Sequence, residues 1–283
     1  MTTNFRITLK PLALVLALLI ALPAFAQNSQ IQEAKVKASK MSEPVLCTII
    51  LPEEYSDPEC QEAQYPVLYL LHGYGGNNTN WVSKKEDLPD MASQYGVIIV
   101  CPDGKNSWYW DSPVNKESQY ETFIAEDLVN FIDNSYRTIP EAGMRAITGL
   151  SMGGHGALFI ALRHPDVFAS CGSMSGGVDI RPFAEKWEMK AALGEYSQNK
   201  AVWDKHTVIN LIPGLKTNQR IVFECGIDDF FIGVNRALHQ AMLDAKIAHD
   251  YAERPGAHTW QFWCNALDYQ MVFFSKAFDA FGQ

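Results

Sequence analysis

The sequence predicts an α/β protein in which helices cover both faces of one mostly parallel, doubly wound sheet. Short runs rich in Val, Ile and Leu show little alternation of apolar and polar residues, which is typical of parallel strands buried on both faces. These runs alternate along the chain with amphipathic helical patterns, as a doubly wound sheet requires. No internal repeat or low-complexity linker divides the chain, so a single domain is expected.

The composition excludes several classes of protein. The chain has 283 residues, of which 47% are hydrophobic and 19% charged, so disorder, a fibrous repeat and a multi-span membrane protein are not expected. The formal net charge is −9, which leaves no surplus of basic residues to neutralise phosphates. A nucleic-acid partner is therefore not expected.

The N-terminal segment predicts a signal peptide over residues 1–26. Arg6 and Lys10 precede the apolar run Leu12–Leu22, and Ala24-Phe25-Ala26 supplies the small residues that a signal peptidase needs. The run is too short to span a bilayer comfortably. We therefore expect an exported protein, periplasmic or secreted, that has no membrane attachment after cleavage and consists of one domain over residues 27–283.

The elements of this domain follow from the same patterns. The predicted strands are Val45–Leu51, Val67–His72, Val97–Cys101, Arg145–Thr148, Ala169–Met174, Arg220–Cys225 and His249–Glu253. The predicted helices are Glu121–Tyr136, Gly154–His164, Gly233–Lys246 and Asn265–Phe281. Residues 179–219 form the longest stretch without a strand between two strands, and we expect them to form a small helical cap over the sheet.

The cysteines give no clear disulfide framework. Four of the six lie in strand-like runs, where buried free thiols are common. Cys60, in a polar stretch, is the best candidate for a bridge, but the sequence does not select its partner. The chain contains no CxxC or HExxH motif and its histidines do not cluster, so a structural or catalytic metal is not expected.

The motif Gly149-Leu150-Ser151-Met152-Gly153 predicts a nucleophile. It follows a predicted strand and opens a predicted helix, so Ser151 would lie on a sharp turn with its hydroxyl above the sheet. Glycines two residues to either side avoid a collision of side chains at such a turn. The turn also aims the N–H of Met152 at the carbonyl under attack, which makes it one donor of an oxyanion hole.

A serine hydroxyl needs a base, and the base needs an acid to orient it. The acid is expected after a late strand, where Asp228 and Asp229 follow Gly226; Asp179 is the weaker alternative. Among the later histidines, His239 and His249 belong to a helix and its end. His258 follows a predicted strand on a glycine-containing loop, and is therefore the predicted base.

The second donor of the oxyanion hole is expected in the glycine-containing loop His72–Asn77. Glycines there let the backbone approach a substrate oxygen, and the Tyr74 N–H is the predicted donor. A nucleotide-binding loop is excluded, because Asn78 stands where GxGxxG needs its third glycine.

Four motifs in order resemble one known group of enzymes. Leu71–Asn77 with Trp81, Gly149–Gly154, Cys225–Asp229 and Gly256–Trp260 are similar to the esterase D-like group of α/β-hydrolases, which includes the feruloyl and acetyl-xylan esterases of carbohydrate esterase family 1. The resemblance covers most of the chain from about Val45. It implies an α/β-hydrolase fold, an acyl-enzyme mechanism without cofactor, and Asp229 as the acid.

Aromatic residues near the predicted centre suit a phenolic acyl group or a sugar ring. Trp81, Trp108, Trp110 and Phe230 are the candidate substrate-binding residues, with Trp108-Tyr109-Trp110 as the expected wall of the binding site. We expect an exported serine carboxylesterase that acts on feruloyl or acetyl esters of plant polysaccharide or oligosaccharides. The alternatives are a short-chain carboxylesterase, an esterase of a siderophore, and a catalytically silent carbohydrate-binding relative.

Overall fold

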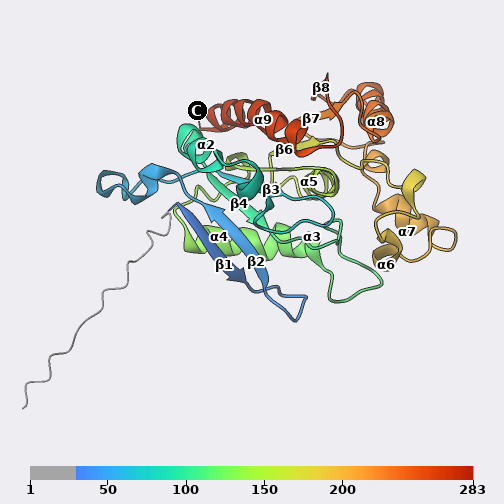
Figure 1. The fold of residues 1–283 in the computed structure, drawn as a ribbon, viewed down its shortest axis with the longest axis horizontal. Helices are drawn as coiled ribbons and strands as arrows, with labels where there is room; N and C mark the ends of the chain where they lie inside the picture. The colour runs from blue at the N-terminus through green and yellow to red at the C-terminus, as the bar shows by residue number, and fades with distance from the viewer. Residues whose placement is uncertain (1–29, 283) are drawn as a thin grey trace, which may run out of the picture.

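The computed structural model describes residues 30–282, in which one eight-stranded sheet lies between two layers of helices (Figure 1). Across the sheet the strands follow the order β1 (Ile31–Val36), β2 (Val45–Ile50), β4 (Ile98–Pro102), β3 (Val67–Leu71), β5 (Arg145–Gly149), β6 (Ser170–Met174), β7 (Arg220–Gly226) and β8 (Asp250–Arg254). Strand β2 pairs antiparallel with both β1 and β4, and all other pairs are parallel. The expected signal peptide, residues 1–26, lies outside the described residues.

Helices cover both faces, which confirms the doubly wound arrangement. One face carries α1 (Asn80–Lys84), α2 (Leu88–Tyr95) and α9 (Trp260–Phe281); the other carries α3 (Tyr120–Thr122), η3 (Phe123–Leu128), α4 (Val129–Ser135), α5 (Met152–Arg163) and α8 (Ile232–Asp244). Short 3-10 turns, η1 (Glu53–Ser56), η2 (Pro58–Cys60) and η4 (Ala142–Met144), lie in connections between these elements.

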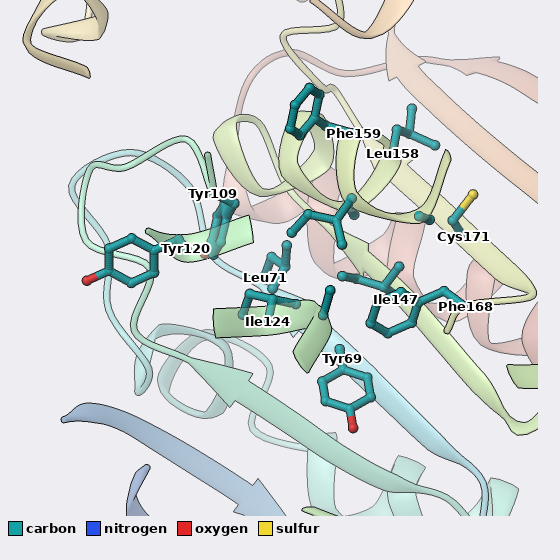
Figure 2. Packing of buried hydrophobic residues seen from close by; sticks show 14 of the residues in the cluster. Tyr69, Leu71, Tyr109, Tyr120, Ile124, Ile147, Leu158, Phe159, Phe168 and Cys171 are labelled. Carbon is teal, nitrogen blue, oxygen red and sulfur yellow. The ribbon is translucent and has the colours of Figure 1, made fainter. Parts of the chain in front are cut away.

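The central strands are buried on both faces, as their continuous apolar character predicted. In β3, Tyr69 and Leu71 belong to the core beneath α5, whereas Leu68 and Leu70 belong to the core beneath α2 and α9. Figure 2 shows Tyr69 and Leu71 in the first of these cores, with Phe159 of α5 in the same cluster. This packing holds the carboxyl ends of the parallel strands in fixed positions, and those ends carry the candidate site.

The structure adds elements that the patterns did not predict. Strand β1 is largely exposed, so its sequence lacks the continuous apolar run of central strands such as β3 and β4. Helices α1 and α2 are five and eight residues long, too short for a clear helical period. The predicted helix Glu121–Tyr136 is α3, η3 and α4 in succession, where η3 is a six-residue π-helical turn.

Residues 179–219 contain short helices in place of a strand. These are η5 (Arg181–Phe183), α6 (Met189–Leu193), α7 (Lys200–Lys205) and η6 (Val208–Leu211). Figure 1 shows α6 and α7 standing apart from the sheet, at the end of the molecule where α8 lies. The buried side chains of Met189, Leu193 and Trp203 join this segment to the main core.

The six cysteines, all within the described residues, are unpaired, so Cys60 forms no disulfide. Burial raises the pKa of the Cys171 thiol to about 12, and the same cause raises that of Cys225 to about 12. These thiols therefore pack as small apolar groups. Among residues 30–282 no helix is both long and apolar enough to cross a bilayer.

Candidate active site

Ser151 lies on the sharp turn between β5 and α5, as the glycine pattern predicted. Its backbone has φ 55° and ψ −114°, a conformation that non-glycine residues rarely adopt. A Cβ atom on Gly149 would lie 2.7 Å from a backbone atom of Gly153, and one on Gly153 would lie 2.6 Å from the carbonyl oxygen of His72. Both glycines are therefore required for the turn to pack against β3.

Two loops bring an acid and a base to Ser151. His258 lies between β8 and α9; its Nδ1–H donates to Oδ2 of Asp229 at 2.8 Å, and its Nε2 lies 2.9 Å from the Ser151 hydroxyl oxygen. Asp229 follows β7, is only 3% exposed, and also accepts the Phe231 N–H at 2.8 Å. The buried carboxylate thus fixes the tautomer in which Nε2 of His258 is free to accept a proton.

The other candidate acids lie elsewhere. The Asp228 side chain is exposed, and only its backbone N–H is engaged, with the Gly256 carbonyl. Asp179 forms a two-pronged ion pair with Arg181, with N···O distances of 2.9 and 2.8 Å. The geometry therefore selects Asp229 from the pair of aspartates that the sequence left open.

The side chains of His239, His249 and His155 have other partners than the Ser151 hydroxyl. His239 and His249 form a hydrogen bond with each other at 2.8 Å, between α8 and the start of β8. His155 is fully buried and accepts the Trp110 indole N–H at 2.8 Å. Burial lowers the pKa of His155 to about 3, so the side chain is neutral near pH 7.

The expected oxyanion donors flank Ser151. Met152 begins α5, and Tyr74 lies in the loop after β3, where Gly75 has φ +76°. Within residues 30–282 neither the Met152 N–H nor the Tyr74 N–H donates to a protein acceptor, so both are available to a ligand oxygen. A hydrogen bond fixes the position of this loop: the Gly75 N–H donates to Oδ1 of Asn106 at 2.8 Å.

Ser151 and His258 open into a pocket of about 730 Å³. Aromatic rings line much of it: Tyr74, Trp187, Phe230, Trp260 and Trp263. Phe230 is 53% exposed and lies 4.3 Å from the His258 ring, centroid to centroid. Trp187 comes from the 179–219 segment and stacks on Phe230 at 5.8 Å.

Of the four predicted substrate-binding residues, the structure places only Phe230 in this pocket. Trp81 is fully buried and donates its indole N–H to the Leu71 carbonyl. Trp108 and Trp110 are buried as a stacked pair, so neither forms a wall of the pocket. The prediction for these three tryptophans was wrong, because all three side chains pack in the hydrophobic core.

Two further pocket residues, Trp260 and Trp263, were not predicted from the sequence. They follow His258 at a spacing of three residues in α9, so they share one face of the helix. This spacing after His258 was the feature of the sequence that could have predicted their place in the pocket. Within the described chain no three His, Cys, Asp or Glu side chains gather in a way that could hold a metal ion.

Comparison with known proteins places this geometry in a family. The model of the Esterase family matches residues 38–274. The chain belongs to the Esterase family. Its relatives include an acetyl esterase of Caldicellulosiruptor saccharolyticus, 28% identical over 81% of this chain and 92% of its own length. This esterase also resembles the solved structure of a ferulic acid esterase, with TM-score 0.75 and 27% identity over 87% of this chain and 98% of the other.

A more distant structure shares the fold of this esterase. The S-formylglutathione hydrolase of Staphylococcus aureus has TM-score 0.76 and 18% identity over 87% of this chain and 98% of its own. The fold is thus that of the α/β-hydrolases, as the sequence motifs implied, and this esterase is a carboxylic-ester hydrolase.

Proposed function

We propose that this esterase hydrolyses carboxylic esters through an acyl-enzyme on Ser151, with His258 as the base and Asp229 as the acid that orients it. One observation supports this assignment above all. A continuous chain of hydrogen bonds runs from Asp229 through His258 to Ser151, and Ser151 faces the aromatic pocket. Nucleophile, base and orienting acid within hydrogen-bond reach are the recurrent arrangement of serine hydrolases.

The reaction has two steps. In the first, Nε2 of His258 takes the proton of the Ser151 hydroxyl as its oxygen attacks the ester carbonyl, and the protonated His258 then gives that proton to the leaving alcohol. In the second, His258 takes a proton from water, which attacks the acyl-enzyme and releases the acid and free Ser151. Asp229 stabilises the imidazolium that forms in each step without itself becoming protonated.

The negative charge on the carbonyl oxygen needs donors of its own. The N–H groups of Tyr74 and Met152 are the proposed oxyanion hole, and Met152 adds the positive end of the α5 dipole. Loss of one such donor costs roughly 3–4 kcal/mol of transition-state stabilisation in other serine hydrolases.

The proposed substrates are feruloyl- or acetyl-type esters of plant polysaccharide or oligosaccharides. The aromatic rings that line the pocket suit a phenolic acyl group, and a ferulic acid esterase is among the structural neighbours. The second candidate is a short-chain carboxylesterase, which the acetyl esterase relative favours. Hydrolysis rates on feruloyl, acetyl-xylose and butyrate esters, compared on one preparation, distinguish the two.

The expected test of the nucleophile is Ser151→Ala. This change should lower kcat on 4-nitrophenyl acetate by about 10⁴-fold or more, while the melting temperature stays close to that of the parent, because only one hydroxyl is lost. Ser275→Ala on α9, which lies outside the pocket, is the matched control and should keep the parental kcat. Activity of Ser151→Ala within a few-fold of the parent would refute the assignment.

Export is part of the proposal, and the support for it is the charged, apolar and small-residue pattern of residues 1–26. Expression of the full chain in a bacterial host should yield a periplasmic or secreted form whose N-terminal residue is Gln27. Recovery of the protein from the cytoplasm with an intact N-terminus would contradict export.

A further inference from the structure

A second concave site, the polar groove, lies beside the catalytic pocket. Its first part measures about 270 Å³ and lies between residues 105–120 and residues 188–192, the latter including most of α6. Its second part measures about 530 Å³ and reaches residues 41–46. Lys105, Glu117 and Tyr120 line both parts, so the two are neighbours, and the second part also has apolar lining residues, among them Met41, Val45 and Leu46.

Two hydrogen bonds form the rim between the catalytic pocket and the polar groove. Tyr74 and Gly75 line the pocket, whereas Asn106 and Glu188 line the groove. The Gly75 N–H donates to Oδ1 of Asn106 at 2.8 Å, and the Tyr74 hydroxyl donates to Oε2 of Glu188 at 3.0 Å. The two cavities are therefore neighbours that this rim separates.

The polar groove offers separate donors and acceptors. The bond from Gly75 uses Oδ1 of Asn106, which leaves its amide Nδ2 free to donate; the bond from Tyr74 leaves Oε1 of Glu188 free to accept. Within residues 30–282 the hydroxyls of Ser118 and Tyr120 have no hydrogen-bond partner. Interspersed single donors and acceptors of this kind are complementary to hydroxyl groups, which both donate and accept.

The charges of the groove disfavour an anionic ligand. Lys105, the one cation among its lining residues, is already paired with Asp103. The Oε2 atom of Glu117 accepts two hydrogen bonds from Ser42, and Glu117 forms no ion pair with any of the described residues. A carboxylate or phosphate would meet Glu117 and Glu188 without a free positive partner. A neutral ligand rich in hydroxyl groups avoids this repulsion and can use the separate donors and acceptors of the groove.

The walls of the groove are built from strained backbone. Of the eight non-glycine residues with positive φ among those described, four lie in the two segments that form the walls: Lys105, Trp108, Tyr109 and Glu188. Packing and hydrogen bonds hold these conformations; the Ser107 hydroxyl, for example, donates to the Gly104 carbonyl and accepts the Tyr109 N–H. Such strain concentrates where a binding surface is preorganised.

We propose that the polar groove binds a neutral sugar chain attached to the ester, and so makes this esterase selective for esters of oligosaccharides over simple esters. The inference rests on the proposed function, since it places the ester at Ser151. It adds a second binding site, separate from the aromatic pocket, that recognises the sugar rather than the acyl group.

The test uses the full chain and blocks the groove without touching the pocket. Ala191→Leu places an aliphatic side chain on an exposed position of the α6 wall, and Ser118→Ala removes one free hydroxyl. Ala280→Leu, at an exposed position of α9 outside both cavities, is the matched control for Ala191→Leu. Melting temperatures verify that all variants are folded.

The first measurement is calorimetric binding of xylotetraose, cellotetraose and an arabinoxylan fragment, none of which carries an ester. The parent should bind at least one at millimolar concentration, and Ala191→Leu should weaken that binding roughly tenfold, the effect of losing one or two hydrogen bonds. Ala280→Leu should bind as the parent does. Absence of binding of all three by the parent, or equal binding by Ala191→Leu, would overturn the proposal whatever the esterase activity.

The second measurement compares acetylated xylo-oligosaccharide with 4-nitrophenyl acetate. Ala191→Leu and, to a smaller extent, Ser118→Ala should raise KM for the oligosaccharide ester relative to that for 4-nitrophenyl acetate, with little change in kcat. A parent that hydrolyses neither ester contradicts the proposed function. A parent that hydrolyses both, with an unchanged KM ratio in Ala191→Leu, contradicts the groove alone.

Discussion

Asp228 and Asp229 are adjacent in the chain and lie in opposite environments. Asp229 is buried against His258, whereas the Asp228 side chain points to solvent. Residue types and chain order narrowed the acid to these two, and a family resemblance favoured Asp229, but only the path of the loop after β7 decides which carboxylate faces the imidazole. That path depends on Gly226, where a Cβ atom would lie 2.3 Å from the Gly256 carbonyl oxygen.

The two aspartates therefore predict a matched pair of variants. Asp229→Asn should lower kcat by about 10⁴-fold, because an amide no longer holds His258 in the tautomer that accepts the serine proton. Asp228→Asn should change kcat by less than about threefold, since its side chain has no part in the hydrogen-bond chain. Both variants are assayed on one ester, with melting temperature as the folding control. If Asp228→Asn, and not Asp229→Asn, loses most of its kcat, the assignment of the acid would be reversed.

At the scale of elements, the secondary structure of the 179–219 segment was predictable from sequence, but its contribution to the pocket was not. The sequence predicted that this segment has no strand and is helical. It did not predict which of the aromatic side chains in the segment lines the site. Trp187 reaches the pocket because its backbone and that of Glu188 adopt positive φ angles, 50° and 53°, ahead of α6. No local pattern of residue types marks this turn, since neither residue is Gly, Asn or Asp.

Trp187 predicts a selective effect on substrate choice. Its ring stacks on Phe230, so Trp187→Ala should remove one wall of the aromatic pocket and lower kcat/KM for a feruloyl ester by about three- to tenfold, the usual size of an aromatic contact. The value for an acetyl ester, which is too small to use that wall, should change less than twofold. Trp187→Phe should recover part of the loss. Equal losses on both esters would indicate general damage to the site instead.

For the whole molecule, the doubly wound sheet and the order of the catalytic motifs were predictable because both depend on long-range regularities of the sequence. Strand β8, at one edge of the sheet, is polar and partly exposed, but six of the eight strands had apolar-rich runs that matched their burial. Strand β1 did not, since its partly exposed position at the sheet edge relaxes that requirement. The tryptophans were misplaced for the opposite reason: an aromatic side chain suits a core and a pocket equally well, and only tertiary structure separates the two.

Stability of the whole fold should depend on pH through His155. This side chain is fully buried between α5 and the loop that carries Trp110, and burial lowers its pKa to about 3. In the unfolded chain a histidine has a pKa near 6.5, so between these values the unfolded state binds one more proton and acid favours unfolding. At pH 5 this difference amounts to about 2 kcal/mol of unfolding free energy relative to pH 8.

His155→Gln tests this contribution, because glutamine offers an acceptor for the Trp110 N–H and does not titrate. Urea unfolding at pH 8 measures the structural cost of the substitution, since the histidine is neutral there in both states. Between pH 8 and pH 5 the variant should then lose about 2 kcal/mol less unfolding free energy than the parent does. Carboxylates that titrate in this range affect both proteins alike, so the difference isolates one proton. Parallel curves for the two proteins would mean that His155 accepts a proton inside the folded core.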